Sequence, residues 1–308
     1  MVEGPPTSET VRARDRMLGI AGWIAVGCAM LTVVGALLTV IADLTHHAIT
    51  GVDISGAFAF LAPVLAALAA GFAGAAFLGS PRARVRRIVA GAALLALSYF
   101  SLCVSYAVLG GIFASHHLPG SLTASIIVSA VANFVVAVTF VAAATAFRGG
   151  TWASSPQRVG RLGIAAFIFV LAMVIAIGSD VLALIAGADL GVDGSTTTAA
   201  GFALAANLVE AAAATTIAIA FVGSISWMRS GRPAWKRYRD RLLAGGVSAL
   251  AFAYVLVSVS SFIDAGQGEF VPGLTKAGRW VMATGDLAFI GVLACAAAAF
   301  FISGWRTR

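Results

Sequence analysis

Six polar side chains that can hold a proton or a cation occur inside long apolar stretches of the sequence. They are four carboxylates and two carboxamides: Asp180, Glu210, Asp264, Asp286, Asn133 and Asn207. A charged side chain in the middle of a bilayer costs about 2.5–3.5 kcal/mol on insertion scales, so such groups usually face other protein or water. The sequence therefore predicts a protonatable site for an ion, a proton or a small solute.

Three of these residues are expected at the same height in the membrane. Asn133, Asn207 and Asp286 each come 14 residues before a phenylalanine that closes an apolar stretch, a distance of about 21 Å along an ideal helix. Pro63 occupies the same position in an earlier stretch, and Glu210 comes three residues closer to its closing phenylalanine. We expect a polar ring in the outer half of the membrane, reached from the extracytoplasmic face. Alternatively, these groups hydrogen-bond neighbouring helices or meet a partner subunit.

The four histidines form two pairs at the outer ends of apolar stretches, His46 with His47 and His116 with His117. Imidazole and carboxylate ligands suit Cu or Zn, so the pairs together with Asp53 predict a surface metal site. The alternative is that imidazoles near helix C-termini interact with the helix dipole and the wet interface. Bis-histidine haem ligation inside the bundle is not expected, because no histidine lies within a span. Haem ligation at the outer surface stays open, and the sequence specifies no cofactor.

The longest connection, residues 227–241, mixes aromatic residues with basic ones. Basic residues at a membrane surface attract anionic lipid headgroups, each contributing about 1 kcal/mol. The sequence predicts headgroup binding at four positions: Arg232, Lys236, Arg237 and Arg239. Docking of a cytoplasmic partner is the alternative.

The elements that position these residues are long apolar stretches. Hydrophobic residues make up 60% of the chain and charged residues only 11%, against about 45–50% and about 25% in soluble domains. A membrane-spanning helix needs about 20 mostly apolar residues. The sequence therefore predicts an all-α integral membrane protein with eight transmembrane helices: residues 17–43, 55–79, 88–114, 122–147, 162–187, 197–228, 242–265 and 278–304.

Basic residues are concentrated on one side of the predicted spans. Of the 20 lysines and arginines, 18 fall before the first span or after an even-numbered one, and only Lys276 and Arg279 fall on the other side. By the positive-inside rule, both termini are cytoplasmic. The net charge of +7 then matches anionic lipid, and no nucleic-acid partner is expected. Residues 1–16 are predicted to form a disordered cytoplasmic tail.

The chain also shows an internal repeat. Four units begin with an arginine and end 59 to 61 residues later with Ala-Phe, which predicts four helical hairpins: residues 17–79, 88–147, 162–228 and 242–304. The likeness of residues 18–21 to residues 162–165 suggests two four-helix halves, 17–147 and 162–304. Because each unit starts and ends in the cytoplasm, the repeats are related by an axis along the membrane normal.

The connections leave no room for a soluble catalytic domain, because none exceeds about 20 residues and such domains need at least about 50. Neither a P-loop nor a GxSxG motif occurs. The leading hypothesis is a small-solute or ion transporter or channel-like permease with Glu210, Asp286 and Asp180 as ligands. The alternatives are a non-catalytic membrane subunit that anchors a larger complex, or a metal- or haem-handling membrane enzyme.

The expected partners are the lipid bilayer, anionic lipids at the cytoplasmic connections, and another membrane protein or further copies of this chain. Arginine greatly outnumbers lysine, and alanine and glycine are abundant. This bias is typical of bacterial proteins encoded by GC-rich genomes. We therefore expect the bacterial cytoplasmic (inner) membrane as the location.

Overall fold

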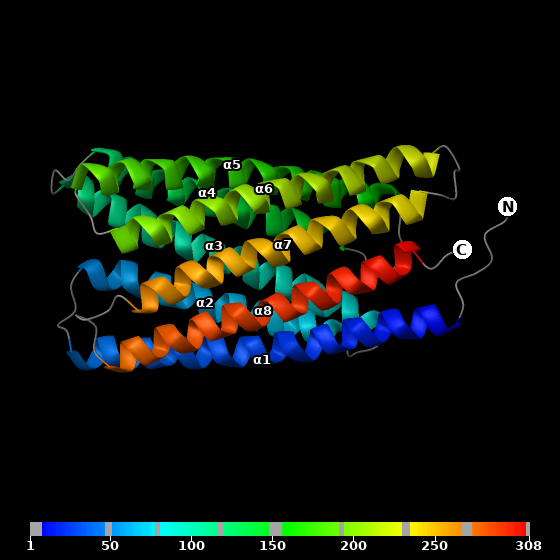
Figure 1. Ribbon diagram of the computed structural model, residues 1–308, viewed down its shortest axis with the longest axis horizontal. Helices are drawn as coiled ribbons and strands as arrows, with labels where there is room; N and C mark the ends of the chain where they lie inside the picture. Colours follow the sequence, from blue (N-terminus) through cyan, green and yellow to red (C-terminus); the bar gives the residue numbers. More distant parts are fainter. Residues whose placement is uncertain are drawn as a thin grey trace.

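The computed structural model describes residues 8–46, 51–77, 81–115, 120–147, 156–190, 194–229, 235–266 and 273–305. Within these ranges every regular element is an α-helix. In chain order the helices are α1 (Ser8–His46), α2 (Gly51–Phe77), α3 (Pro81–Ser115), α4 (Gly120–Ala146), α5 (Pro156–Leu190), α6 (Gly194–Arg229), α7 (Trp235–Gly266) and α8 (Gly273–Trp305). Consecutive helices run antiparallel, so α1 begins and α8 ends at the same end of the bundle (Figure 1).

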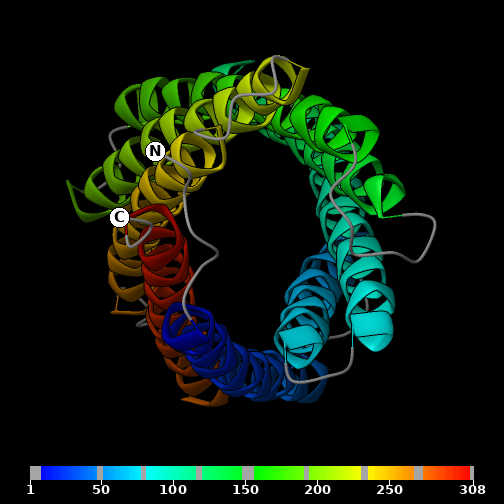
Figure 2. The same cartoon turned by 90° about the vertical axis from the view of Figure 1, so that its right-hand side faces the viewer.

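The described helices form a closed ring. Each helix packs against the helices before and after it in the chain, and α8 packs against α1. No other pair of described helices is in contact. Viewed end-on, the helices surround a central axis, and the ring closes where α1 and α8 lie side by side (Figure 2).

The distribution of apolar side chains is typical of a multi-pass membrane protein. Large apolar residues are exposed on every helix, among them Trp23, Met30 and Phe167, whereas most of the buried apolar residues are alanines. Such extensive exposed apolar surface is solvated by lipid rather than by water. Eight spans were expected, and within the described residues seven helices are long and apolar enough to cross a membrane. In the searched part of α2, the apolar stretch is shorter, Leu61–Ala76.

Small residues at seven-residue intervals let the even-numbered helices approach their neighbours. Residues seven apart lie on nearly the same side of a helix, and small side chains there allow close contact between helices in lipid. The buried small residues in this register are Ala62, Ala69 and Ala76 in α2, Ala132, Thr139 and Ala146 in α4, Ala206, Ala213 and Ala220 in α6, and Gly285 and Ala299 in α8.

The start of α1 differs from the sequence-based expectation. Residues 1–16 were expected to be disordered, but α1 begins at Ser8 and runs unbroken through the charged segment into the apolar one. Arginine, which favours helix, occurs three times in this segment. Glu9 in the first turn also carries the charge that complements the helix dipole. Residues 1–7 lie outside the described ranges.

Helices α3 and α5 also begin before their apolar stretches, and their arginines bind the preceding helix. Pro81 and Pro156 open α3 and α5, at a position where proline lacks only an N–H that would have no helical partner. Arginines in the next turns donate hydrogen bonds to the last carbonyl oxygens of α2 and α4, which otherwise lack partners. These pairs are Arg84–Ala76 (3.3 Å), Arg87–Ala75 (2.6 Å), Arg158–Ala146 (3.0 Å) and Arg161–Thr145 (3.2 Å).

Candidate functional site

A cavity of about 300 Å³ lies inside the ring. Six of the eight helices, α3 to α8, contribute to its wall. The wall has six polar residues and four apolar ones: Tyr99, Asn133, Asn207, Glu210, Tyr254 and Asp286, with Ala132, Val136, Met173 and Val257. We call this space the central cavity.

Four of the polar residues singled out in the sequence line the central cavity together. Asn133 comes from α4, Asn207 and Glu210 from α6, and Asp286 from α8. Asp180 of α5 reaches this group indirectly, because its carboxylate accepts a hydrogen bond of 2.6 Å from the side-chain amide of Asn207. The α7 residue Asp264 is helical, but its side chain lies outside what the structure describes.

The central cavity is acidic. Two of its ten lining residues carry carboxylates and none is basic. The Ser261 hydroxyl donates a long hydrogen bond of 3.4 Å to the carboxylate of Asp286. Within the described ranges, the Glu210 carboxylate accepts no hydrogen bond and forms no ion pair. An enclosed carboxylate without a partner either holds a proton or attracts a cation.

A cluster of serines between α4 and α5 holds one side of the cavity wall. The Ser129 and Ser179 hydroxyls lie 2.6 Å apart. The hydroxyl groups of Ser125 and Ser179 also donate to each other's backbone carbonyl oxygens, at 2.9 and 2.8 Å. Asn133 donates to the Ser129 carbonyl oxygen at 2.8 Å, which directs its side chain. We call Ser125, Ser129 and Ser179 the serine seam.

Two tyrosines of the cavity wall were not identified from the sequence. Tyr99 stacks on Phe140 with ring centroids 5.6 Å apart, and Tyr254 packs against Phe289 with centroids 5.0 Å apart. Their spacing in the sequence could have identified them. They follow the arginines that open their repeat units, Arg87 and Arg241, by 12 and 13 residues, which places both rings at a similar depth.

Most of the predicted metal site lies outside what the structure describes. His46 ends α1 but its side chain is not described, and His47, His116 and His117 lie outside the described ranges. Among the residues that are described, no group of three or more His, Cys, Asp or Glu side chains is placed to hold a metal ion. Asp53 lies in α2, again without a described side chain.

The predicted headgroup-binding residues are partly described. Lys236 is exposed at the start of α7, and Arg239 forms an ion pair of 2.8 Å with the buried Asp240. Arg237 is helical without a described side chain, and Arg232 lies outside the described ranges.

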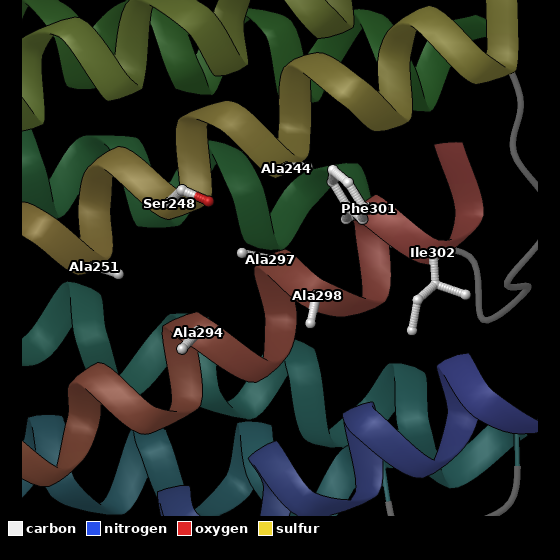
Figure 3. Close-up of a pocket in the computed structure, with 8 residues that line it drawn as sticks. All are labelled: Ala244, Ser248, Ala251, Ala294, Ala297, Ala298, Phe301 and Ile302. Atoms are coloured by element: carbon white, nitrogen blue, oxygen red, sulfur yellow. The ribbon is translucent and has the colours of Figure 1, made fainter. Parts of the chain in front are cut away.

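A second hollow lies on the exposed face of the α7–α8 pair and is predominantly apolar (Figure 3). It measures about 440 Å³. Alanines from both helices form most of its wall, and Ser248 is its only polar residue: Ala244, Ser248, Ala251, Ala294, Ala297, Ala298, Phe301 and Ile302. We call it the outer crevice.

Comparison of the chain with known protein families, with curated proteins and with solved structures found no match.

Proposed function

We propose that this chain is a multi-pass protein of the bacterial cytoplasmic membrane that moves a proton, an ion or a small solute through its ring of helices. The central cavity is the binding site in this proposal. The supporting observation is that two carboxylates and two carboxamides from three helices meet in one cavity whose wall has no basic residue. Carboxylates inside membrane spans usually belong to ion or proton pathways.

Within this proposal, Glu210 and Asp286 bind the positive charge. Asn207 is an orienting residue, because its amide is committed to Asp180 and so links that third carboxylate to the site. Asn133 is held by the Ser129 carbonyl oxygen and presents its own carbonyl oxygen as a further ligand. Asp264 is proposed as an outer carboxylate along the path.

The proposal places both chain ends in the cytoplasm. The described arginines other than Arg279 gather at the end of the ring where α1 begins and α8 ends, whereas Lys276 and Arg279 lie in the first turns of α8 at the opposite end. Basic connections are retained in the cytoplasm. The exposed Lys236 at the start of α7 is then at the height of anionic headgroups, which we propose as its partners.

Four repeated hairpins also fit this arrangement. The closing alanines of the four units, Ala76, Ala146, Ala220 and Ala299, are all buried, with exposed fractions of 0 to 3%. The hydrogen bonds of Arg84 and Arg87 at the start of α3 are matched by those of Arg158 and Arg161 at the start of α5. Repeats related by an axis along the membrane normal would place equivalent helices around a shared centre.

The test is charge movement by the full-length protein in lipid vesicles. A negative-inside potassium diffusion potential drives cations inward, and a potential-sensitive dye reports their entry. We expect Glu210→Gln to reduce the flux by about tenfold or more, because loss of one partner of a buried charge pair costs about 2–5 kcal/mol. Asp286→Asn should reduce it to a similar extent.

The matched control is Thr215→Val on the same helix. Thr215 is exposed, and its hydroxyl donates to the carbonyl oxygen of Ala211 within α6, so this change should leave the flux unaltered. Flux that is equal in wild-type and Glu210→Gln vesicles would contradict the proposal. The absence of any flux above that of protein-free vesicles would contradict it as well.

The outer crevice favours a second candidate, a membrane subunit that anchors a larger complex. Small residues at a helix surface allow a further helix to approach closely, and most of the crevice wall is alanine. This candidate predicts a stable partner after purification in mild detergent, lost on Ala298→Leu, and no flux by the chain alone.

A further inference from the structure

We infer that the central cavity binds a small organic cation, of the alkylammonium class. The carboxylates of Glu210 and Asp286 meet its charge, and the rings of Tyr99 and Tyr254 meet its alkyl groups. The inference rests on the proposed function, because it names the class of solute taken by the same cavity.

The sign of the ligand's charge follows from the cavity wall. Glu210 and Asp286 are acidic, and the wall has no lysine, arginine or histidine. The Asp286 carboxylate has one long hydrogen bond, from Ser261, and Glu210 has no hydrogen-bonding or ion-pairing side chain among the described residues. An anion would meet two negative charges, whereas a cation supplies the opposite charge that neither carboxylate finds among the described side chains.

The size and lining of the cavity favour an organic cation over a bare metal ion. Hard metal ions take six to eight oxygen ligands at about 2.0–2.6 Å, which requires a tight cluster of donors. The described residues contain no group of three or more His, Cys, Asp or Glu side chains placed for this. The cavity measures about 300 Å³, which is at the lower end of the range for small-molecule pockets, roughly 300–1,000 Å³.

The apolar part of the wall matches an alkyl group. Met173, Val136 and Val257 line the same space as the two carboxylates. A hydrated inorganic ion gains nothing from such surface, whereas an ion with methyl or ethyl groups buries them there. Methionine also adapts its shape to varied ligands.

The two tyrosines complete an aromatic surface for the cation. Rings of this kind attract ammonium ions through their faces. Tyr99 is supported by Phe140 at 5.6 Å and Tyr254 by Phe289 at 5.0 Å, so both rings are held before a ligand arrives. Preorganised side chains lose little conformational entropy on binding.

The test measures equilibrium binding of radiolabelled tetraethylammonium to the full-length protein in detergent at neutral pH. We expect saturable binding to one site per chain, displaced by other alkylammonium ions but not by equal concentrations of sodium or calcium. Glu210→Gln and Asp286→Asn should each weaken binding by about tenfold or more. Thr215→Val, with its hydroxyl on the exposed face of α6, should leave binding unchanged.

Two substitutions of Tyr254 distinguish an aromatic contact with the ligand from a merely structural role. Tyr254→Phe keeps the ring and removes only the hydroxyl, so binding should stay within about twofold, whereas Tyr254→Leu should weaken it roughly two- to thirtyfold. Size-exclusion profiles of both variants are compared with that of the wild type to check that they fold. Equal binding by the phenylalanine and leucine variants would overturn the aromatic assignment.

Two further outcomes separate this inference from the proposed function. If cation flux depends on Glu210 but tetraethylammonium neither binds nor inhibits, the organic-cation assignment is wrong and transport stands. If tetraethylammonium binds with the expected dependence on Glu210 and Tyr254 but no charge moves in vesicles, the ligand site stands and the transport function is wrong.

Discussion

The two sides of the ring are held together by different forces. Around α1, the contacts depend on glycine: a Cβ atom added at Gly35 would lie 2.5 Å from Met282 Cγ and 2.7 Å from the Gly278 carbonyl oxygen, and one at Gly74 would lie 2.5 Å from the Gly22 carbonyl oxygen. Between α4 and α5, the serine seam supplies hydrogen bonds instead.

The helices that line the central cavity also differ between the two sides of the ring. Neither α1 nor α2 contributes a lining residue to the central cavity, and all of its polar groups come from α3 to α8. Helices in lipid gain little from the hydrophobic effect when they associate, so they need close packing or hydrogen bonds. The comparison indicates that close packing closes the ring around α1, while hydrogen bonds join α4 to α5 beside the binding site.

The largest effect on stability is expected from Gly35→Leu. The added side chain would collide with the α8 backbone, and overpacking of this kind costs about 3 kcal/mol or more. We expect a clear fall in the thermal midpoint of the protein in detergent, measured by size-exclusion chromatography after heating. Gly27→Leu on the same helix is the control, because a Cβ there meets nothing within 4 Å. Equal midpoints for the two variants would show that α1 and α8 are not in this close contact.

An intermediate effect is expected from Ser179→Ala in the serine seam. This change removes the hydroxyl that joins α5 to both Ser125 and Ser129. Interhelical hydrogen bonds in membranes contribute about 0.6–1.7 kcal/mol, so the thermal midpoint should fall less than for Gly35→Leu. Ser248→Ala, at an exposed position in the outer crevice, should not change it. A loss as large as that of Gly35→Leu would remove the distinction between the two sides.

The smallest effects are expected where the two sides are alike. Arg87 binds the end of α2 and Arg161 binds the end of α4 in the same way. Arg87→Gln and Arg161→Gln should each destabilise the protein by about 0.3–1 kcal/mol, the usual contribution of a cation at a helix C-terminus. The thermal midpoints of the two variants, measured in detergent without denaturant, should coincide. A large difference between them would show that the matched hydrogen bonds differ in environment.

Much of the helical framework could be predicted from the sequence, because long apolar stretches with short connections permit little else. Closure of α8 onto α1 could not be predicted. Short connections force neighbours in the chain to pack together, but nothing in their length brings the first and last helices into contact. That contact depends on where Gly35, Gly278 and Gly285 fall on two helix surfaces far apart in the chain.

The sequence indicated which polar residues would lie together in the candidate site, but not their hydrogen-bond partners. The shared spacing before the closing phenylalanines placed Asn133, Asn207 and Asp286 at one level, and they line one cavity. The hydrogen bond between Asn207 and Asp180 depends on the rotation of α5 against α6, which spacing along the chain does not specify. Tyr99 and Tyr254 went unnoticed because tyrosine inside a span is as compatible with packing as with binding.

The central cavity exists only if α8 closes the ring against α1, so closure is the claim on which the account depends. In the structure, Thr32 Oγ1 lies 3.0 Å from the position of a Cβ atom at residue 285, which is within reach of a disulfide. The most direct test introduces Thr32→Cys and Gly285→Cys in a chain whose native cysteines, Cys28, Cys103 and Cys295, have been replaced.

Oxidation in native membranes, followed by a non-reducing gel, should give a disulfide within one chain. The control pair Thr32→Cys with Thr284→Cys, in which the second position is exposed, should stay reduced under the same conditions. A crosslink that forms only between two chains, or one that forms equally fast in the control pair, would contradict the closed ring.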